Sequence, residues 1–181
     1  ALDRYALRRL VRESGERLKV AGVASPEHDA RELAEWILGT QLPLVDGADE
    51  AFAATYEKAV QRRAAREPLQ RITGRMFFRG LELECRPGVF IVRPETEVVA
   101  GVAIEAVLAR ERGGVAGGPL VVDLCTGSGA IAAAVAAEVP AARVIAVELA
   151  DDAVVAAVAA VAACERYAPG RVRVVQADAA A

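Results

Sequence analysis

The sequence predicts an α/β fold in which a parallel, helix-covered sheet follows a small helical domain and a linker that contains a β-hairpin. Over residues 120–176, apolar strand-like runs alternate with helix-like stretches, a pattern typical of parallel sheets. Over residues 1–67, apolar side chains recur instead at three- and four-residue spacing, which indicates amphipathic helices. A chain of 181 residues, 54% hydrophobic and 26% charged, has room for one large or two small globular domains.

Residues 1–67 are expected to form the helical domain. An amphipathic helix is predicted over 3–21. Ser25-Pro26 is a favourable start for the second helix, because serine can cap the first turn and proline fits the first helical position. Gly39 ends that helix, and a third is predicted over 49–66.

Residues 68–95 are expected to form the linker. Strand candidates at 76–78 and 81–85 flank the turn Arg79-Gly80, which predicts a hairpin. Pro87-Gly88 then interrupts the secondary structure again.

The third region, 96–181, alternates between helix and strand patterns. The predicted elements are helix 96–112, strand 120–124, helix 130–138, strand 143–148, helix 152–166 and strand 171–176. Since parallel strands lie between helices, we expect the strand 120–124 to be buried and the sheet to be covered on both faces.

Composition argues against several classes of protein. A net charge of −3 gives no general attraction to nucleic acid. No apolar run approaches the roughly 18–20 residues of a membrane span, and charges near the N-terminus do not fit a signal peptide. Cys85, Cys125 and Cys164 are too few and too widely spaced for a zinc site or a disulfide framework. We therefore expect packing cysteines, no metal and a cytoplasmic location.

The glycine-rich stretch 127–132 (GSGAIA) follows a predicted strand and opens a helix. It matches G-x-G-x-x-A, and Glu148 ends the next predicted strand, as in nucleotide-binding folds. Glycines allow a tight turn close to a ligand, and the acid can accept hydrogen bonds from ribose hydroxyls. The simpler alternative is a glycine turn that binds nothing.

Asp123 distinguishes between two cofactors. It lies four residues before Gly127, where a dinucleotide would place its anionic pyrophosphate. A carboxylate there repels phosphate but favours the ammonium and sulfonium groups of S-adenosyl-L-methionine. Asp178, after the third strand, could accept the adenine amino group; the alternative is a surface residue that caps a following helix.

Several motifs together resemble one enzyme family. They are PLQRITG (68–74), PGVFIVRPETE (87–97), DLCTGSGAI (123–131), AVEL (146–149) and QAD (176–178). The chain resembles the HemK/PrmC family, whose members are protein-(glutamine-N5) methyltransferases that act on peptide chain release factors. RPETE is the most specific of these motifs, whereas the glycine loop marks only a class I methyltransferase. The resemblance implies a Rossmann-like, S-adenosylmethionine-dependent methyltransferase sheet, which we expect to be truncated in this chain.

The resemblance also implies site residues. Together with Asp123, the cofactor site comprises Cys125, Thr126, Gly127, Ser128, Gly129, Glu148, Asp178 and Ala179. The implied substrate pocket comprises Phe90, Arg93 and Thr96, although Thr96 also fits a helix N-cap. Many members have glycine where Cys125 stands, so Cys125 needs either a negative φ or a tolerated strain. Ala179 stands where the resemblance implies an aromatic residue that stacks on adenine.

The implied partner is a release factor, bound as protein substrate at its Gly-Gly-Gln loop and recognised by the helical domain. We expect a monomer with no membrane or direct nucleic-acid contact. The family's catalytic Asn-Pro-Pro-Tyr follows a fourth strand and orients the substrate amide for in-line attack. This sequence contains no Asn, so no catalytic residue is expected in this chain. Without the fourth strand, the edge of strand 120–124 should be unpaired.

The missing motif and the chain's Ala-rich end bear on the expected function. We expect a fragment of a longer methyltransferase. The alternatives are a methyltransferase for another protein glutamine or for adenine, and a non-catalytic cofactor-binding module. An NAD-dependent dehydrogenase is disfavoured by Asp123.

Overall fold

The computed structural model describes residues 1–114, 117–164 and 169–180. The chain divides into two compact units, Ala1–Thr73 and Gly74–Ala181. Within the described ranges, no helix is both long enough and apolar enough to cross a membrane.

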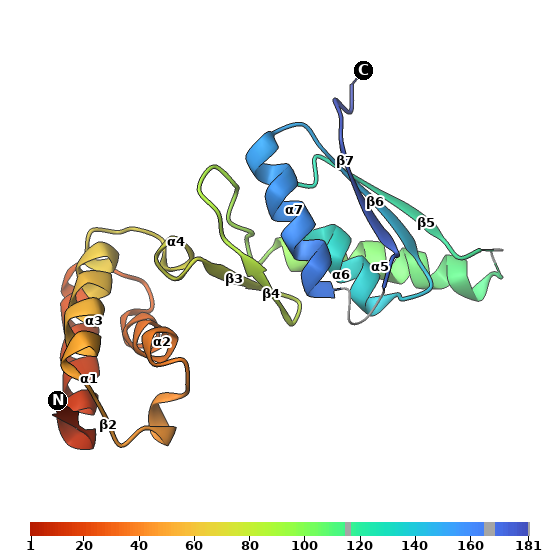
Figure 1. The fold of residues 1–181 in the computed structure, drawn as a ribbon. Helices are drawn as coiled ribbons and strands as arrows, with labels where there is room; N and C mark the ends of the chain where they lie inside the picture. The colour runs from red at the N-terminus through yellow and green to blue at the C-terminus, as the bar shows by residue number, and fades with distance from the viewer. Residues whose placement is uncertain (115–116, 165–168, 181) are drawn as a thin grey trace. The chain divides into compact units, whose positions relative to one another are not determined.

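The first unit is a bundle of helices (Figure 1). Its elements are β1 (Leu2–Asp3), α1 (Arg4–Val20), α2 (Pro26–Leu38), the 3₁₀ turn η1 (Leu42–Leu44), β2 (Gly47–Ala48), α3 (Glu50–Ala64) and α4 (Leu69–Thr73). The apolar faces of α1, α2 and α3 form one core, as their spacing predicts. Inside it, the Tyr56 hydroxyl donates to the Ala30 carbonyl at 3.0 Å, and burial raises the pKa of Tyr56 to about 12.

Two local expectations in this unit are wrong. Helix α3 ends at Ala64 rather than at residue 66, because Arg66 adopts a left-handed φ of 71° and Pro68 follows two residues later. Residues Leu69–Thr73, expected to belong to a linker, form α4, which buries Ile72 in the helical core.

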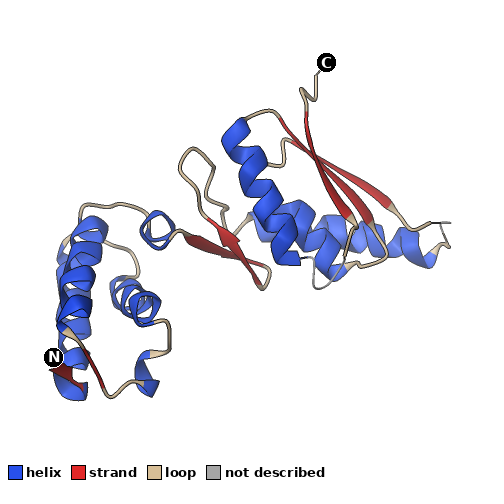
Figure 2. Cartoon of the chain, in the orientation of Figure 1, coloured by secondary structure: helices blue, strands red, loops and turns tan. Residues whose placement is uncertain are grey.

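The second unit contains the predicted hairpin and the alternating elements (Figure 2). They are β3 (Arg75–Phe78), β4 (Leu81–Glu84), α5 (Thr96–Arg112), β5 (Leu120–Leu124), α6 (Ala130–Glu138), β6 (Arg143–Glu148), α7 (Asp151–Cys164) and β7 (Val172–Gln176). Strands β3 and β4 pair antiparallel, whereas β5, β6 and β7 form a parallel sheet in that order. The predicted parallel α/β architecture is confirmed.

The described helices cover one face of this sheet. Val144 and Ala146 are buried beneath α6 and α7. On β5, Leu120, Val122 and Leu124 are 54%, 50% and 56% exposed, so the prediction of a buried strand is wrong. Side chains alternate between sheet faces, and these three fall on the face away from α6. Strand β5 also pairs only with β6 among the described strands, which leaves the predicted open edge.

Arg79 joins the hairpin to two helices of the second unit. At the hairpin turn it adopts a φ of 45°, and its guanidinium forms two bonds with the Glu138 carboxylate at the end of α6. The same side chain donates to the Glu97 carbonyl at 3.1 Å, and its backbone N–H donates to the Glu97 carboxylate at 3.0 Å. The hairpin is therefore fixed to the start of α5.

Candidate cofactor site

The glycine loop joins the carboxyl end of β5 to the amino end of α6. Three of its residues have left-handed backbone conformations, with φ of 56° at Cys125, 59° at Gly127 and 77° at Gly129. Cys125 thus takes the strained alternative, in a conformation that disfavours residues with a Cβ. The Thr126 N–H donates to the Val147 carbonyl at 2.9 Å and fixes the loop to the neighbouring strand.

Two carboxylates from adjacent strands hold this loop. The Thr126 hydroxyl donates to Asp123 Oδ2 at 2.6 Å, and the Gly127 N–H donates to Glu148 Oε2 at 2.8 Å. Glu148 Oε1 also accepts the N–H groups of Leu149 and Ala150, at 2.9 and 3.1 Å. The predicted Asp123 and Glu148 therefore each hold one residue of the same loop, Thr126 and Gly127 respectively.

The pKa values of the two acids shift in opposite directions. Burial raises the pKa of Glu148, but the N–H donors of Ala150, Gly127 and Leu149 outweigh it, and the net pKa lies below the ordinary value. Burial raises the pKa of Asp123, and the nearby charge of Glu148 adds to the rise, while the Thr126 hydroxyl opposes it. The charged groups that hold the loop are thus acids, which suits hydroxyl donors and cations and opposes pyrophosphate.

The end of β7 lies beside the same acid. The Ala177 N–H donates to the Glu148 carbonyl at 3.0 Å, which brings Asp178 and Ala179 next to β6. Both are exposed, and Asp178 Oδ1 accepts the Ala180 N–H at 2.9 Å, so the carboxylate stabilises a local turn.

Gln176 belongs to the QAD motif but was not among the predicted site residues. Its amide donates to the Leu149 carbonyl, at 3.1 Å, and to the Asp151 carboxylate, bracing the turn after Glu148. Its register opposite Glu148 at the strand end was the signal that could have identified it.

The loop that carries PGVFI packs against the start of α7. Gly88 has a φ of 80°, and a Cβ there would lie 2.9 Å from Asp152 Oδ2. Val89 is buried with Ala153 and Ala156. Since α7 begins just after β6 ends, this loop lies at the carboxyl edge of the sheet. Gly88 is thus needed for close packing against α7, in addition to its predicted role of interrupting secondary structure.

The three predicted substrate residues lie along this segment. Phe90 is 65% exposed, and the Arg93 guanidinium lies 5.5 Å from its ring centre. Thr96 is the first residue of α5 rather than its N-cap, because Glu95 occupies that position in a helical conformation without a side-chain cap bond. Within the described residues no hydrogen bond joins these three side chains to the glycine loop, so their substrate role stays a prediction.

The remaining predicted residues occupy contrasting environments. Ser128 is buried at the start of α6. Cys85 is buried, as expected of a packing residue, but Cys125 is exposed, so the packing role predicted for it is wrong. The Cys164 side chain lies outside the described residues. Across the part of the chain that the structure describes, no group of three His, Cys, Asp or Glu residues is arranged to hold a metal ion.

Replacing Asp123 with Asn should stabilise the protein near neutral pH. A raised pKa means that the folded state binds the proton more tightly than the unfolded state, whose carboxyl titrates near 3.8. The charged carboxylate therefore opposes folding above its folded-state pKa, and this effect disappears as the pH falls below the unfolded value. Asn keeps an acceptor for Thr126 without the charge. Urea unfolding should show Asp123→Asn to be more stable at pH 7, with the difference shrinking towards about pH 4; a constant difference would contradict the electrostatic origin.

Comparisons with known proteins agree with this architecture. Residues 9–74 match the PrmC N-terminal domain family. The chain is 55% identical over 146 residues to the release factor glutamine methyltransferase of Streptomyces coelicolor, covering 79% of this chain and 50% of that protein. It is 44% identical over 148 residues to the Bifidobacterium longum protein of the same name, covering 77% and 49%.

A third relative has a different printed activity. The 4-amino-L-phenylalanine/4-methylamino-L-phenylalanine methyltransferase of Streptomyces pristinaespiralis is 45% identical over 121 residues, covering 66% of this chain and 39% of that protein. The chain spans about half the length of the Streptomyces coelicolor and Bifidobacterium longum proteins.

Proposed function

Because the chain belongs to the HemK/PrmC family, we propose that it supplies the helical domain and the cofactor-binding half of a release factor glutamine methyltransferase. The observation that carries this proposal is the pair of carboxylates that hold the glycine loop, Asp123 and Glu148. Glu148 fits the ribose of either cofactor. Asp123 fits S-adenosyl-L-methionine, which has no phosphate, and opposes the pyrophosphate of a dinucleotide.

In this proposal the chain's residues bind and orient the cofactor. Glu148 accepts the ribose hydroxyls, since its backbone donors keep the carboxylate ionised. Asp123 attracts the ammonium group, Asp178 accepts the adenine amino group, and Gly127 and Gly129 permit close approach of the backbone. When bound, S-adenosyl-L-methionine supplies a methyl group activated by its sulfonium.

The proposed substrate is the side-chain amide of a release factor glutamine. Phe90, Arg93 and Thr96 would line its approach, and the helical unit would bind the release factor. This sequence has no Asn-Pro-Pro-Tyr to orient the amide nitrogen, so the residues described here bind and position rather than catalyse. A monomeric cytoplasmic protein without nucleic-acid or membrane contact fits this role.

A second candidate substrate is an aromatic amine, as named for the Streptomyces pristinaespiralis relative. It is the weaker candidate, because the match covers 66% of the chain at 45% identity, against 79% at 55% for the Streptomyces coelicolor methyltransferase.

Glu148→Ala should weaken S-adenosyl-L-methionine binding by about 10- to 100-fold, the range expected when charged hydrogen bonds are lost. Calorimetric titration of the full chain measures this, and Glu148→Gln separates the loss of charge from the loss of the acceptor. Glu111→Ala, on the exposed surface of α5, is the control. Unchanged affinity in Glu148→Ala, or tight NAD binding by the unmodified chain, would contradict the proposed site.

A further inference from the structure

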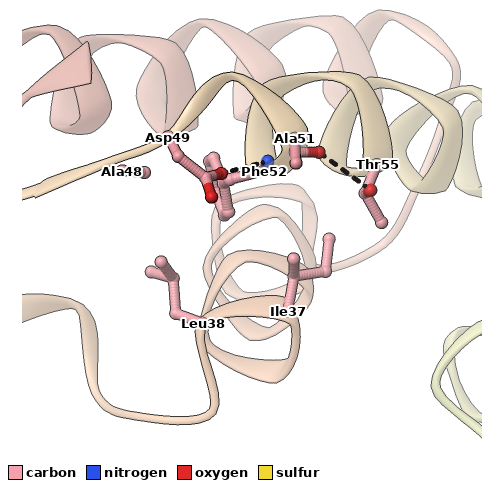
Figure 3. Close-up of a pocket in the computed structure, with 7 residues that line it drawn as sticks. All are labelled: Ile37, Leu38, Ala48, Asp49, Ala51, Phe52 and Thr55. Carbon is pink, nitrogen blue, oxygen red and sulfur yellow. Dashed lines mark hydrogen bonds between the residues drawn. The ribbon is translucent and has the colours of Figure 1, made fainter. Parts of the chain in front are cut away.

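A groove of about 400 Å³ lies in the helical unit, between the carboxyl end of α2 and the amino end of α3 (Figure 3). Its lining residues are Ile37, Leu38, Ala48, Asp49, Ala51, Phe52 and Thr55. Figure 3 shows Ile37 and Leu38 on α2 opposite Asp49 and Thr55 on the α3 side. The volume lies within the range of sites that hold a small ligand or an anchoring side chain.

Of the two polar side chains that line this groove, one is neutral and the other carries a negative charge. The Thr55 hydroxyl already donates to the Ala51 carbonyl at 2.9 Å. Asp49 is the charged lining residue, and its Oδ1 accepts the Phe52 N–H at 2.7 Å as the cap of α3. A full carboxylate charge exceeds the roughly half charge of the helix end that it caps. Asp49 therefore leaves net negative charge at the rim.

The end of α2 adds to this potential. Its final carbonyl groups carry the negative end of the helix dipole, and its last turn contains no basic residue to offset them. An apolar floor with a negative rim complements a side chain with an aliphatic stem and a cationic head.

We propose that the groove binds an arginine or lysine side chain of the protein substrate. Its stem lies along Ile37, Leu38 and Phe52, and its charged head lies at Asp49. This inference rests on the proposed function, since the partner that supplies the cation is the release factor. The groove then acts as an anchor for the protein substrate in the helical unit.

Asp49→Asn should weaken binding of unmethylated Streptomyces coelicolor release factor to the full chain by about 2- to 5-fold, the effect expected for one solvent-exposed ion pair. Asn caps helices as well as Asp does, so α3 should keep its stability. Asp3→Asn is the matched control, because Asp3 caps α1 in the same way, accepting the Ala6 N–H at 2.8 Å, but does not line the groove. Equal affinities of Asp49→Asn and the unmodified chain would overturn the proposal.

Small-molecule probes test the chemistry independently of the release factor. N-acetyl-arginine amide at millimolar concentration should shift the NMR signals of Phe52 and Leu38, with much smaller shifts for N-acetyl-norleucine amide. Equal shifts from both would overturn the role of Asp49. Release factor binding that is absent from the unmodified chain would overturn the proposed protein substrate, whereas the Glu148 titration tests the cofactor half separately.

Discussion

Gly129→Ala should destabilise the protein by about 2 to 5 kcal/mol, the sum of the costs of a left-handed alanine and of an overpacked contact. Gly129 has a φ of 77°, and a Cβ there would lie 2.8 Å from Ala157 Cα and 3.1 Å from its Cβ. Both contacts lie on α7, so relief requires α6 and α7 to move apart. Since the loop between β5 and α6 would move with them, cofactor affinity should fall together with stability.

Gly127→Ala separates backbone strain from packing. Its φ of 59° imposes a similar conformational cost, but an added Cβ meets nothing within 4 Å, and the N–H that donates to Glu148 is retained. We expect a loss of about 1 to 2 kcal/mol. Urea unfolding of both variants measures the difference. Equal losses would show that the close approach of α7 does not matter.

The fold follows from sequence patterns where local chemistry and burial agree. Over the described residues, the elements from residue 96 onward match their predicted ranges closely, because apolar strands, Ala-rich helices and glycine breaks all indicate the same structure. The last two residues of the predicted helix 152–166 lie outside the described residues. Patterns predict less well where a residue has two possible environments. The apolar side chains of β5 suggest burial, but their exposure depends on what covers the other face of the sheet.

The site was predictable in its charges and less so in its contacts. Asp123 and Glu148 stand at recognisable strand ends, which is why sequence spacing found them. The left-handed backbone of Cys125, the bond between Gln176 and Asp151, and the packing of Gly88 on Asp152 depend on residues distant in the chain. No spacing rule specifies such contacts.

Asp29→Ala should destabilise the protein by about 3 kcal/mol, the lower end of the cost of leaving one member of a buried ion pair alone. Arg63 Nε donates to Asp29 Oδ2 at 2.7 Å, and the two side chains are only 15% and 10% exposed. Arg63 also donates to the Glu67 carbonyl at 2.9 Å, which satisfies part of the guanidinium but not its charge. The pair joins α2 to α3, so its loss should loosen the packing of the two helices that line the groove around Asp49.

Glu57→Ala provides the comparison, because Glu57 forms a two-bond ion pair with Arg17 at 2.7 and 2.8 Å, but the side chains are 41% and 46% exposed. Because this ion pair is exposed, Glu57→Ala should lower the unfolding free energy by at most about 1 kcal/mol, despite the favourable geometry of the pair. The double variant Asp29→Leu with Arg63→Met should recover most of the loss of Asp29→Ala, since it removes the stranded charge as well as its partner. Urea unfolding measures the loss of unfolding free energy in each variant. Equal losses for Asp29→Ala and Glu57→Ala would show that burial does not set the strength of these ion pairs.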